Sequence, residues 1–219
     1  MKWRVQAIAG AKPCNCDHPN LTLTAIRLHG SCVHNEGTMQ PQPEHYKAPA
    51  RWLHWSVALL VLAMLPVGLL MVQQGLSRPL QNALFLFHKN AGVIVALLVA
   101  ARLFYRWRNP PPPLPAGLPD WQRQVSTWTH GTLYGLIILM PVSGYVRVRA
   151  GGFPIEMLDA LGIGTFLPKS EALANAAKSL HYAGAWALAL LVALHVGAAL
   201  QHALIKRDGI FQRMWPARD

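Results

Sequence analysis

Hydrophobic residues are gathered in four long stretches of the chain, and polar residues fill the segments between them. Each stretch is close to the ~20 residues that a membrane-spanning helix needs. The spans that we assign are approximately 52–72, 83–105, 130–147 and 180–204. Pro66 and Pro141 lie inside spans, where neighbouring helices can satisfy the carbonyls that a proline frees. The pattern therefore predicts an all-α fold, an integral membrane bundle of four transmembrane helices.

Composition and charge agree with a membrane protein. The chain is 53% hydrophobic and only 13% charged, about half the charged fraction of an average soluble domain. Its net charge of +11 comes from Lys and Arg in the segments between spans, where such residues set membrane orientation. Nucleic-acid binding is therefore not expected. More of these cations flank the termini and the proline-rich connector RWRNPPPPLPAGLPDWQRQ than the other loops. We therefore expect both termini and this connector on the inner side of the membrane.

Residues 1–45 have no counterpart in the pattern that follows, and they lack the features of a signal peptide. Within the first 38 of these residues lie Cys14, Cys16 and Cys32 together with His18, His29 and His34. A zinc site is one reading, but the spacing does not match a paired C-x₂₋₄-C set. The other reading is a disordered extension or the product of an upstream start codon, with Met39 as the true start. The membrane domain is then 46–219.

Two histidines of the last span, His181 and His195, are the most informative residues. Ionisable side chains are rare in membrane helices and are usually functional there. The two are 14 residues apart, which is roughly 21 Å of helical rise and roughly 40° short of four whole turns. Both imidazoles therefore point to one side of the helix, one near each face of the membrane.

The earlier spans supply a partner at each of these two depths. With helices that alternate in direction, His54 matches His195 near the inner face, and His88 matches His181 near the outer face. Two imidazoles fill both axial positions of a haem iron and leave an electron-transfer centre. Zinc would want a third and a fourth ligand, and no cysteine or carboxylate lies at these depths. We therefore expect two bis-histidine haems.

Other residues near the histidines have less certain roles. Gly92, Gly184 and Gly197 leave room for a flat macrocycle, although ordinary close helix packing explains them equally well. His130 begins the third span without an obvious partner; a propionate contact, a quinone-site role and an interfacial residue remain open. His202 lies seven residues beyond His195, and hydrogen bonding to a quinone carbonyl is one interpretation.

These residues resemble the bacterial cytochrome b561 family of membrane cytochromes. The resemblance covers about Tyr46 to Pro216, and its motifs are RWLHW, FHKNAGVIVALLVAARLFYRWRNPPPP, HGTLYGLIILMPVSGY and LHYAGAWALALLVALH. It implies a four-helix bundle with two haems b, whose axial ligands correspond to His54, His88, His181 and His195. It also implies that Arg102 contacts a haem propionate. The family is similar to the cytochrome b subunits of nickel–iron hydrogenases and formate dehydrogenases.

We therefore expect an electron-transfer oxidoreductase that links a donor at the outer face to membrane ubiquinone, with the quinone near Arg102, His202 and Lys206. Five cations make the surface near the outer face positively charged, and this charge would steer a small anion such as superoxide toward it. They are Lys89, Arg147, Arg149, Lys169 and Lys178. A protein donor is the other possibility. In the alternative function, the chain is a haem-b subunit that relays electrons between a partner dehydrogenase or hydrogenase and the quinone pool.

Overall fold

The computed structural model describes residues 45–114 and 117–215. The chain divides into two units, 1–39 and 40–219, and every described residue belongs to the second. The predictions for the N-terminal extension, its cysteines and Met39 therefore lie outside the described residues. The elements are α1 (Ala48–Leu70), α2 (Arg78–Arg108), α3 (Asp120–Ala150), α4 (Glu156–Ala160), α5 (Glu171–Leu200) and the π-helical turn η1 (Gln201–Lys206). The described part of the chain contains no strand, as the all-α prediction requires.

Four helices of the described residues are long and apolar enough to cross a membrane, namely α1, α2, α3 and α5 with η1. The protein is therefore a multi-pass membrane protein. The helices extend beyond the predicted spans, most of all α3, which begins at Asp120 and not near His130. Residues 120–129 are mostly polar, but no glycine or proline interrupts them. Hydropathy locates the part of a helix that faces lipid, whereas the helix itself continues until a residue breaks its hydrogen bonds.

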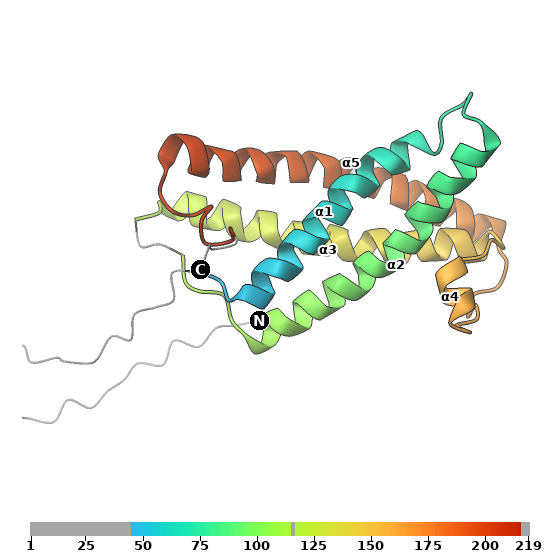
Figure 1. Cartoon of the computed structure of the whole chain (residues 1–219), viewed down its shortest axis with the longest axis horizontal. Helices are drawn as coiled ribbons and strands as arrows, with labels where there is room; N and C mark the ends of the chain where they lie inside the picture. Colours follow the sequence, from blue (N-terminus) through green and yellow to red (C-terminus); the bar gives the residue numbers. More distant parts are fainter. Residues whose placement is uncertain (1–44, 115–116, 216–219) are drawn as a thin grey trace, which may run out of the picture. The chain divides into compact units, whose positions relative to one another are not determined.

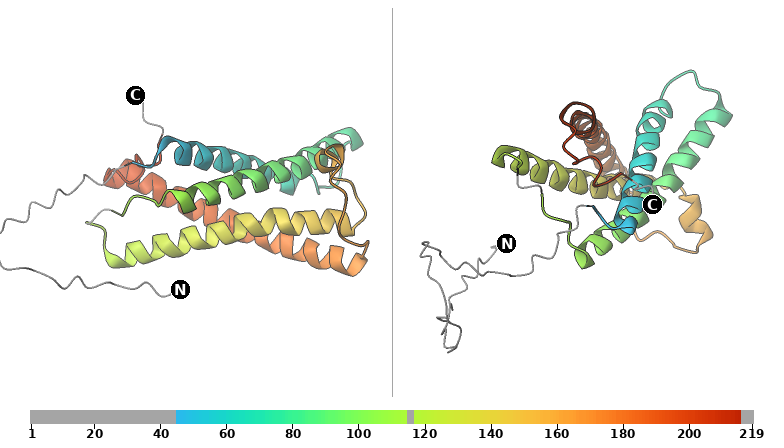
Figure 2. Two further views of the ribbon diagram at one scale, coloured as in Figure 1. Left: turned by 90° about the horizontal axis from the view of Figure 1, so that it is seen from below. Right: turned by 60° about the vertical axis from the view of Figure 1, so that its left-hand side comes forward.

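The helices form two layers. α1 packs against α2, and α3 packs against α5. Figure 1 shows α1 and α2 lying across α3 and α5 at an angle, and the left view of Figure 2 shows the two layers edge on. Among the long described helices, α5 packs closely only against α3. Because α5 stays apart from α1 and α2, side chains and a bound group have space between the layers.

The core between the layers is narrow and consists of branched aliphatic side chains. Its buried members are Val57, Val61, Val95, Val99, Leu133 and Leu188. Large apolar side chains such as Leu59, Leu97 and Leu190 are exposed on the outer faces of the helices. In water such a surface would be a liability, but lipid tails are as apolar as leucine. The exterior therefore suits the bilayer.

The two ends of the bundle differ in construction. At one end lie the α1–α2 connection, α4 and its flanking loops; we call this the α4 end. At the other end α1 begins, the connector joins α2 to α3, and the segment 207–215, which we call the C-terminal strap, follows η1. Residues 110–114 of the connector are neither helical nor extended in a sheet, as the proline run predicts.

Candidate functional site

The first pair of candidate ligands lies toward the α4 end. The imidazole of His88 in α2 faces that of His181 in α5, with ring centroids 6.1 Å apart and planes at 75°. A metal–imidazole nitrogen bond is about 2.0–2.1 Å long and the ring centroid lies about 1.1 Å further out, so two rings on opposite sides of one metal have centroids about 6.3 Å apart. The observed separation fits a metal held between the two rings.

Two glycines provide the space that these rings occupy. A Cβ atom added at Gly68 of α1 would lie 3.0 Å from Cε1 of His88, and one added at Gly144 of α3 would lie 3.2 Å from Cε1 of His181. Each histidine is thus seated on a glycine of the helix that packs beside its own. Three other glycines were expected from the sequence to leave room for a macrocycle or to serve ordinary helix packing. Gly92 lines the cavity described next. Gly184 faces the sulfur of Met140, as in ordinary helix packing, and Gly197 has no such neighbour within 4 Å.

A large cavity of about 1480 Å³ opens beside this first pair. Its wall is mostly apolar, and it includes both His88 and His181. The lining also includes charged and polar side chains, among them Asn82, Lys89, Arg147, Glu156, Asn175 and Lys178. A largely apolar cavity that also has cationic side chains in its wall suits a flat aromatic macrocycle that carries two carboxylates on one edge. The donor set, the ring separation and the cavity all fit a haem at this position.

The second pair lies toward the other end of the bundle, where the C-terminal strap lies; we call this the C-terminal end. His54 of α1 and His195 of α5 have ring centroids 6.4 Å apart and planes at 79°, again close to the separation of two imidazoles across one metal. The fit of a haem at this position rests on the separation of the two rings and on their imidazole nitrogens as donors. Both pairs expected from depth are therefore neighbours in the structure, while their role as ligands stays a prediction.

A third histidine joins this second pair. The ring of His130 lies 5.3 Å from that of His195, closer than two rings that share a metal, so this is a direct edge contact. His130 Nδ1 donates to the carbonyl oxygen of Ser126 at 2.7 Å, which leaves Nε2 as an acceptor. The sequence suggested no partner for His130 because it placed this residue at the edge of its span. Since α3 begins ten residues earlier, about 15 Å of helix precedes His130.

Arg102 of α2 is anchored at the same end. Its Nη1 donates to the carbonyl oxygen of Ala50 at 2.9 Å, and its Nε donates to the hydroxyl oxygen of Tyr134 at 3.1 Å. These contacts use two of the five N–H donors of the guanidinium. The arginine therefore ties the start of α1 to α3 and stands as a fixed cation near His54. Its contact with a propionate stays a prediction.

His202 forms a short contact with Asp208 that the sequence did not predict. Its Nδ1 lies 2.6 Å from Oδ2 of Asp208, a partner beyond the last span. The π-helical turn η1 and the left-handed backbone of Arg207, with φ 51°, turn the chain so that these side chains meet. Burial raises the pKa of Asp208, but the hydrogen bonds from His202 and from backbone N–H groups, together with the charge of His202, outweigh this effect and hold that pKa below its ordinary value. Asp208 is thus a carboxylate that accepts from His202.

The C-terminal strap covers this end of the bundle. The backbone N–H of Tyr46 donates to the carbonyl oxygen of Arg213 at 3.1 Å, and Trp55 Nε1 donates to that of Met214 at 2.9 Å. The buried guanidinium of Arg213 donates to the carbonyl oxygens of Pro112 and Pro113 at 3.0 and 2.7 Å. The proline run therefore has a structural use, because its free carbonyls hold the strap against the start of α1.

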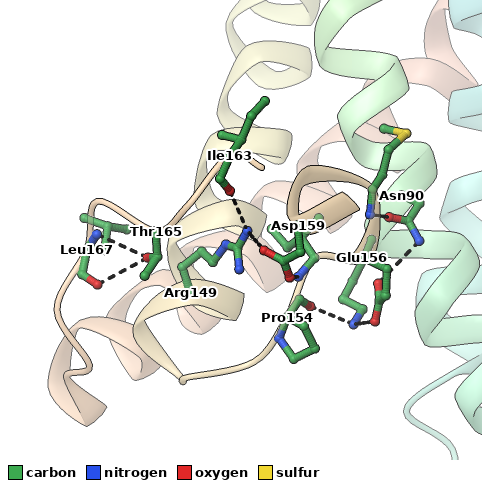
Figure 3. A network of polar contacts seen from close by, with 11 residues as sticks. Asn90, Arg149, Pro154, Glu156, Asp159, Ile163, Thr165 and Leu167 are labelled. Carbon is green, nitrogen blue, oxygen red and sulfur yellow. Dashed lines mark hydrogen bonds and ion pairs between the residues drawn. The ribbon is translucent and has the colours of Figure 1, made fainter. Parts of the chain in front are cut away.

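At the α4 end, a polar network connects α4 to α2 and α3 (Figure 3). Lys89 Nζ donates to Glu156 Oε1 at 2.6 Å and Arg149 Nη2 donates to Asp159 Oδ1 at 2.6 Å. The backbone N–H of Met157 donates to Asn90 Oδ1 at 2.9 Å. Burial raises the pKa of Glu156, but the hydrogen bonds from Lys89, the backbone and Asn90, together with the charge of Lys89, outweigh it and lower the pKa. The hydrogen bond from Arg149 lowers the pKa of Asp159.

This network changes the expectation of a cationic mouth. Of the five cations named from the sequence, Lys89 and Arg149 are paired with carboxylates and contribute no net charge. Arg147 and Lys178 line the cavity beside the histidines, and Lys169 lies outside that lining. The field that an approaching anion meets at the cavity therefore depends mainly on Arg147 and Lys178.

An all-α membrane bundle with paired imidazoles between its layers has the architecture of a haem-carrying membrane protein. The model of the prokaryotic cytochrome b561 family matches residues 45–217, and the chain belongs to that family. It is similar to cytochrome b561 homolog 2 of Escherichia coli (strain K12), with 31% identity over 173 residues, 78% of this chain and 92% of the relative. It is also similar to cytochrome b561 homolog 1 of the same organism, with 29% identity over 131 residues, 60% of this chain and 74% of the relative. The protein is thus a membrane b-type cytochrome that binds haem b and transfers electrons.

Proposed function

We propose that this protein is a di-haem cytochrome b of a bacterial inner membrane. His88 and His181 hold one haem, and His54 and His195 hold the other. The observation that carries the proposal is the presence of two imidazole pairs, 6.1 and 6.4 Å apart, that share α5 at positions 14 residues apart. The two proposed centres would therefore lie at different depths between the same layers. Both termini and the C-terminal end then face the cytoplasm.

The chain determines where electrons can enter and leave. A bound haem would supply a one-electron ferric–ferrous couple at each pair. Because each haem would be held by two imidazoles, it would serve electron transfer and not the binding of a small ligand. The apolar layers exclude water, and Arg102, fixed by Ala50 and Tyr134, places a positive charge beside the second pair. These residues favour electron transfer over ligand activation.

We propose that ubiquinone is reduced at the C-terminal end, beside His202, Asp208, Arg102 and Lys206. Reduction of a quinone to a quinol consumes two electrons and two protons. His202 donates to Asp208 through Nδ1, so its Nε2 is the atom that exchanges a proton with a quinone oxygen. The carboxylate of Asp208 orients the imidazole of His202 through Nδ1, and Nε2 of that imidazole can take up its next proton from the aqueous side. Lys206, which donates to Gln122 at 3.3 Å, adds a cation at the same end.

For the donor at the α4 end, we propose superoxide. Two superoxide anions give up one electron each and leave as dioxygen, and one quinone takes up both electrons with two protons. Arg147 and Lys178 line the cavity beside His88 and His181, where they attract a small anion. The rate of haem reduction by superoxide is then expected to fall as ionic strength rises, because salt screens long-range attraction. A rate that is independent of salt would exclude steering.

One observation favours the second candidate function, in which the chain relays electrons for a partner dehydrogenase or hydrogenase. The loop after α4 exposes large apolar side chains, with Leu161 68% and Phe166 84% exposed. Such side chains suit contact with a protein as well as with lipid. Co-purification of a dehydrogenase whose substrate reduces the bound haem, and loss of this coupling in a Leu161→Ser and Phe166→Ser variant, would select the relay function.

The direct test of the proposal is spectroscopic. Purified protein is expected to show a reduced-minus-oxidised spectrum of b-type haem and a ratio of two haems per chain. It is also expected to reduce ubiquinone when supplied with superoxide. A colourless protein, or one with a single haem, would contradict the di-haem assignment.

A further inference from the structure

Ser143 of α3 is a buried polar residue toward the α4 end of the membrane domain. Its side chain is 3% exposed. Its Oγ lies 2.7 Å from the carbonyl oxygen of Leu139 and 3.1 Å from that of Met140. The same Oγ lies 3.0 Å from Nδ1 of His181 on α5. A serine in a helix commonly donates to the carbonyl four residues earlier; the contact with His181 is additional.

The direction of the contact follows from the number of protons available. A serine hydroxyl carries one proton. Two oxygens 2.7 Å apart must share a proton, and the carbonyl of Leu139 has none to give, so the Ser143 proton lies on that contact. Toward His181, Ser143 therefore offers only lone pairs. His181 Nδ1 must carry a proton and donate it, which leaves Nε2 unprotonated and free to bind a metal.

Geometry fixes the ring as well as its tautomer. Gly144 follows Ser143 in α3, and a Cβ atom there would lie 3.2 Å from Cε1 of His181. Ser143 and Gly144 thus form one seat, in which the hydroxyl holds Nδ1 and the glycine leaves room for the adjacent carbon. A rotation of the imidazole would break the hydrogen bond or press the ring against α3.

The facing histidine differs in this respect. His88 rests on Gly68, but its Nδ1 is a buried atom with no hydrogen-bond partner among the described residues. Of the two imidazoles at the α4 end, only that of His181 has its Nδ1 hydrogen-bonded to a side chain of a neighbouring helix. The two positions are therefore chemically unequal.

We infer that Ser143 is a positioning residue that sets the tautomer and the donor strength of His181 and thereby lowers the reduction potential of the haem at the α4 end. The inference rests on the proposed function, in which His181 is an axial ligand. An imidazole that donates from Nδ1 places more electron density on Nε2. That density stabilises the ferric form relative to the ferrous form. The second pair has no contact with Ser143, so its potential should not depend on this residue.

The test compares Ser143→Ala with Ser143→Thr in the full-length, haem-loaded protein. In a redox titration followed by visible absorption, Ser143→Ala is expected to move one of the two reduction steps to a more positive potential and to leave the other unchanged. The electron paramagnetic resonance signal of the same low-spin haem is expected to shift. Threonine keeps a hydroxyl that can bond the carbonyl four residues earlier, so Ser143→Thr should retain the wild-type potential.

Loss of haem is a second readout. Removal of a hydrogen-bond partner of a metal-binding histidine typically weakens binding about 10-fold to 100-fold. If Ser143→Ala loses the haem of the α4 end, Ser143→Thr must restore it; a threonine variant that fails to restore it contradicts the inference. Two unchanged potentials in a fully loaded Ser143→Ala protein also overturn it.

These outcomes are separate from failure of the proposed function. The parallel variant His181→Ala is expected to lose one haem. If His181→Ala keeps both haems, His181 is not a ligand and the proposed ligation is wrong. If it loses one haem while Ser143→Ala leaves both potentials unchanged, the ligation stands and only the role of Ser143 is wrong.

Discussion

The two histidine pairs have almost the same separation but very different surroundings. At the α4 end, His88 and His181 sit on glycines beside a cavity of about 1480 Å³. At the C-terminal end, a Cβ atom added at Gly131 or Gly135 of α3 would meet no other group within 4 Å. A third histidine, a fixed arginine and the C-terminal strap surround that pair instead. The α4 end therefore has a cavity that gives access to its histidine pair, whereas the C-terminal end has charged and titratable side chains around its pair.

The difference indicates how one type of ligand pair serves two tasks. Electron exchange with a small donor requires only an open path to the edge of the centre, which the cavity at the α4 end supplies. Quinone reduction also requires protons, and titratable side chains such as His202 and Asp208 are gathered at the C-terminal end. In the proposed function both pairs supply the same kind of ligand, so their surroundings would decide what each centre does.

The most severe way to separate the two ends is to remove one pair at a time. The double variants His88→Ala/His181→Ala and His54→Ala/His195→Ala are each expected to lose one haem and retain the other, because each pair holds its own iron. Haem-to-protein ratio and the redox titration measure this result. His45→Ala, outside the spans, is the matched control and should keep both haems. Loss of both haems from either double variant would show that the centres are not independent.

Filling a glycine seat tests the α4 end specifically. Gly68→Val adds side-chain atoms where a Cβ alone would lie 3.0 Å from His88. Overpacking typically costs about 1–3 kcal/mol, which corresponds to about 5-fold to 150-fold weaker haem binding. Gly131→Ala, at a position with no neighbour within 4 Å, is the control. Equal haem content in both variants would show that haem binding does not depend on the space that Gly68 leaves for His88.

Asp208→Asn tests the C-terminal end. Asparagine keeps the size of the side chain but removes the carboxylate that accepts from His202. A hydrogen bond to a charged group is worth about 1.5–3 kcal/mol, and since this pair is partly exposed we expect the lower limit, about a ten-fold slower reduction of ubiquinone. Reduction of the haems by dithionite should be unchanged. A variant that slows both steps equally would place Asp208 outside the quinone reaction.

Charge at the cavity is expected to have a smaller effect. Arg147→Gln and Lys178→Gln should each reduce the rate of haem reduction by superoxide several-fold at low salt, within the range of electrostatic steering. Lys89→Gln combined with Glu156→Gln removes an ion pair of zero net charge and should leave the rate nearly unchanged. Stopped-flow measurements at several ionic strengths compare the variants. A double variant as slow as Lys178→Gln would contradict the assignment of the steering charges.

The smallest effect concerns the tether of α4. The pKa values of Glu156 and Asp159 are lowered in the folded protein, so their ion pairs stabilise the loop above the unfolded pKa values of about 4. This stabilisation is lost as pH falls through the lower folded values. Both carboxylates are largely exposed, so the energy involved is small. Proteolysis of the loop 151–170 by an acid-stable protease should increase below about pH 4, and Glu156→Gln should show the increase already at neutral pH.

Sequence reasoning reached the fold and the depth of the histidines because both follow from local properties. Hydropathy reports a span of about 20 residues directly, and the rise of about 1.5 Å per residue converts a separation of 14 residues into a distance along α5. It was least accurate where polar residues continue a helix, as at the start of α3. That error displaced His130 from its neighbour His195.

Other features required the rotation of each helix about its own axis. Ser143 and His181 are 38 residues apart, and Lys89 and Glu156 are 67 residues apart. No periodicity within one helix indicates which residue of another helix will face it. Gly68 and Gly144 lie in different helices from the histidines that they contact. Glycines close to each histidine in the sequence are therefore not the ones that contact its ring.

By itself, the sequence determined that the protein crosses a membrane four times and carries histidines at two depths, because the cost of placing polar groups in lipid acts on each segment separately. Only the tertiary structure decided which side chains surround each pair. Those contacts depend on how α1 and α2 lie across α3 and α5, and that arrangement results from the packing of all the helices together.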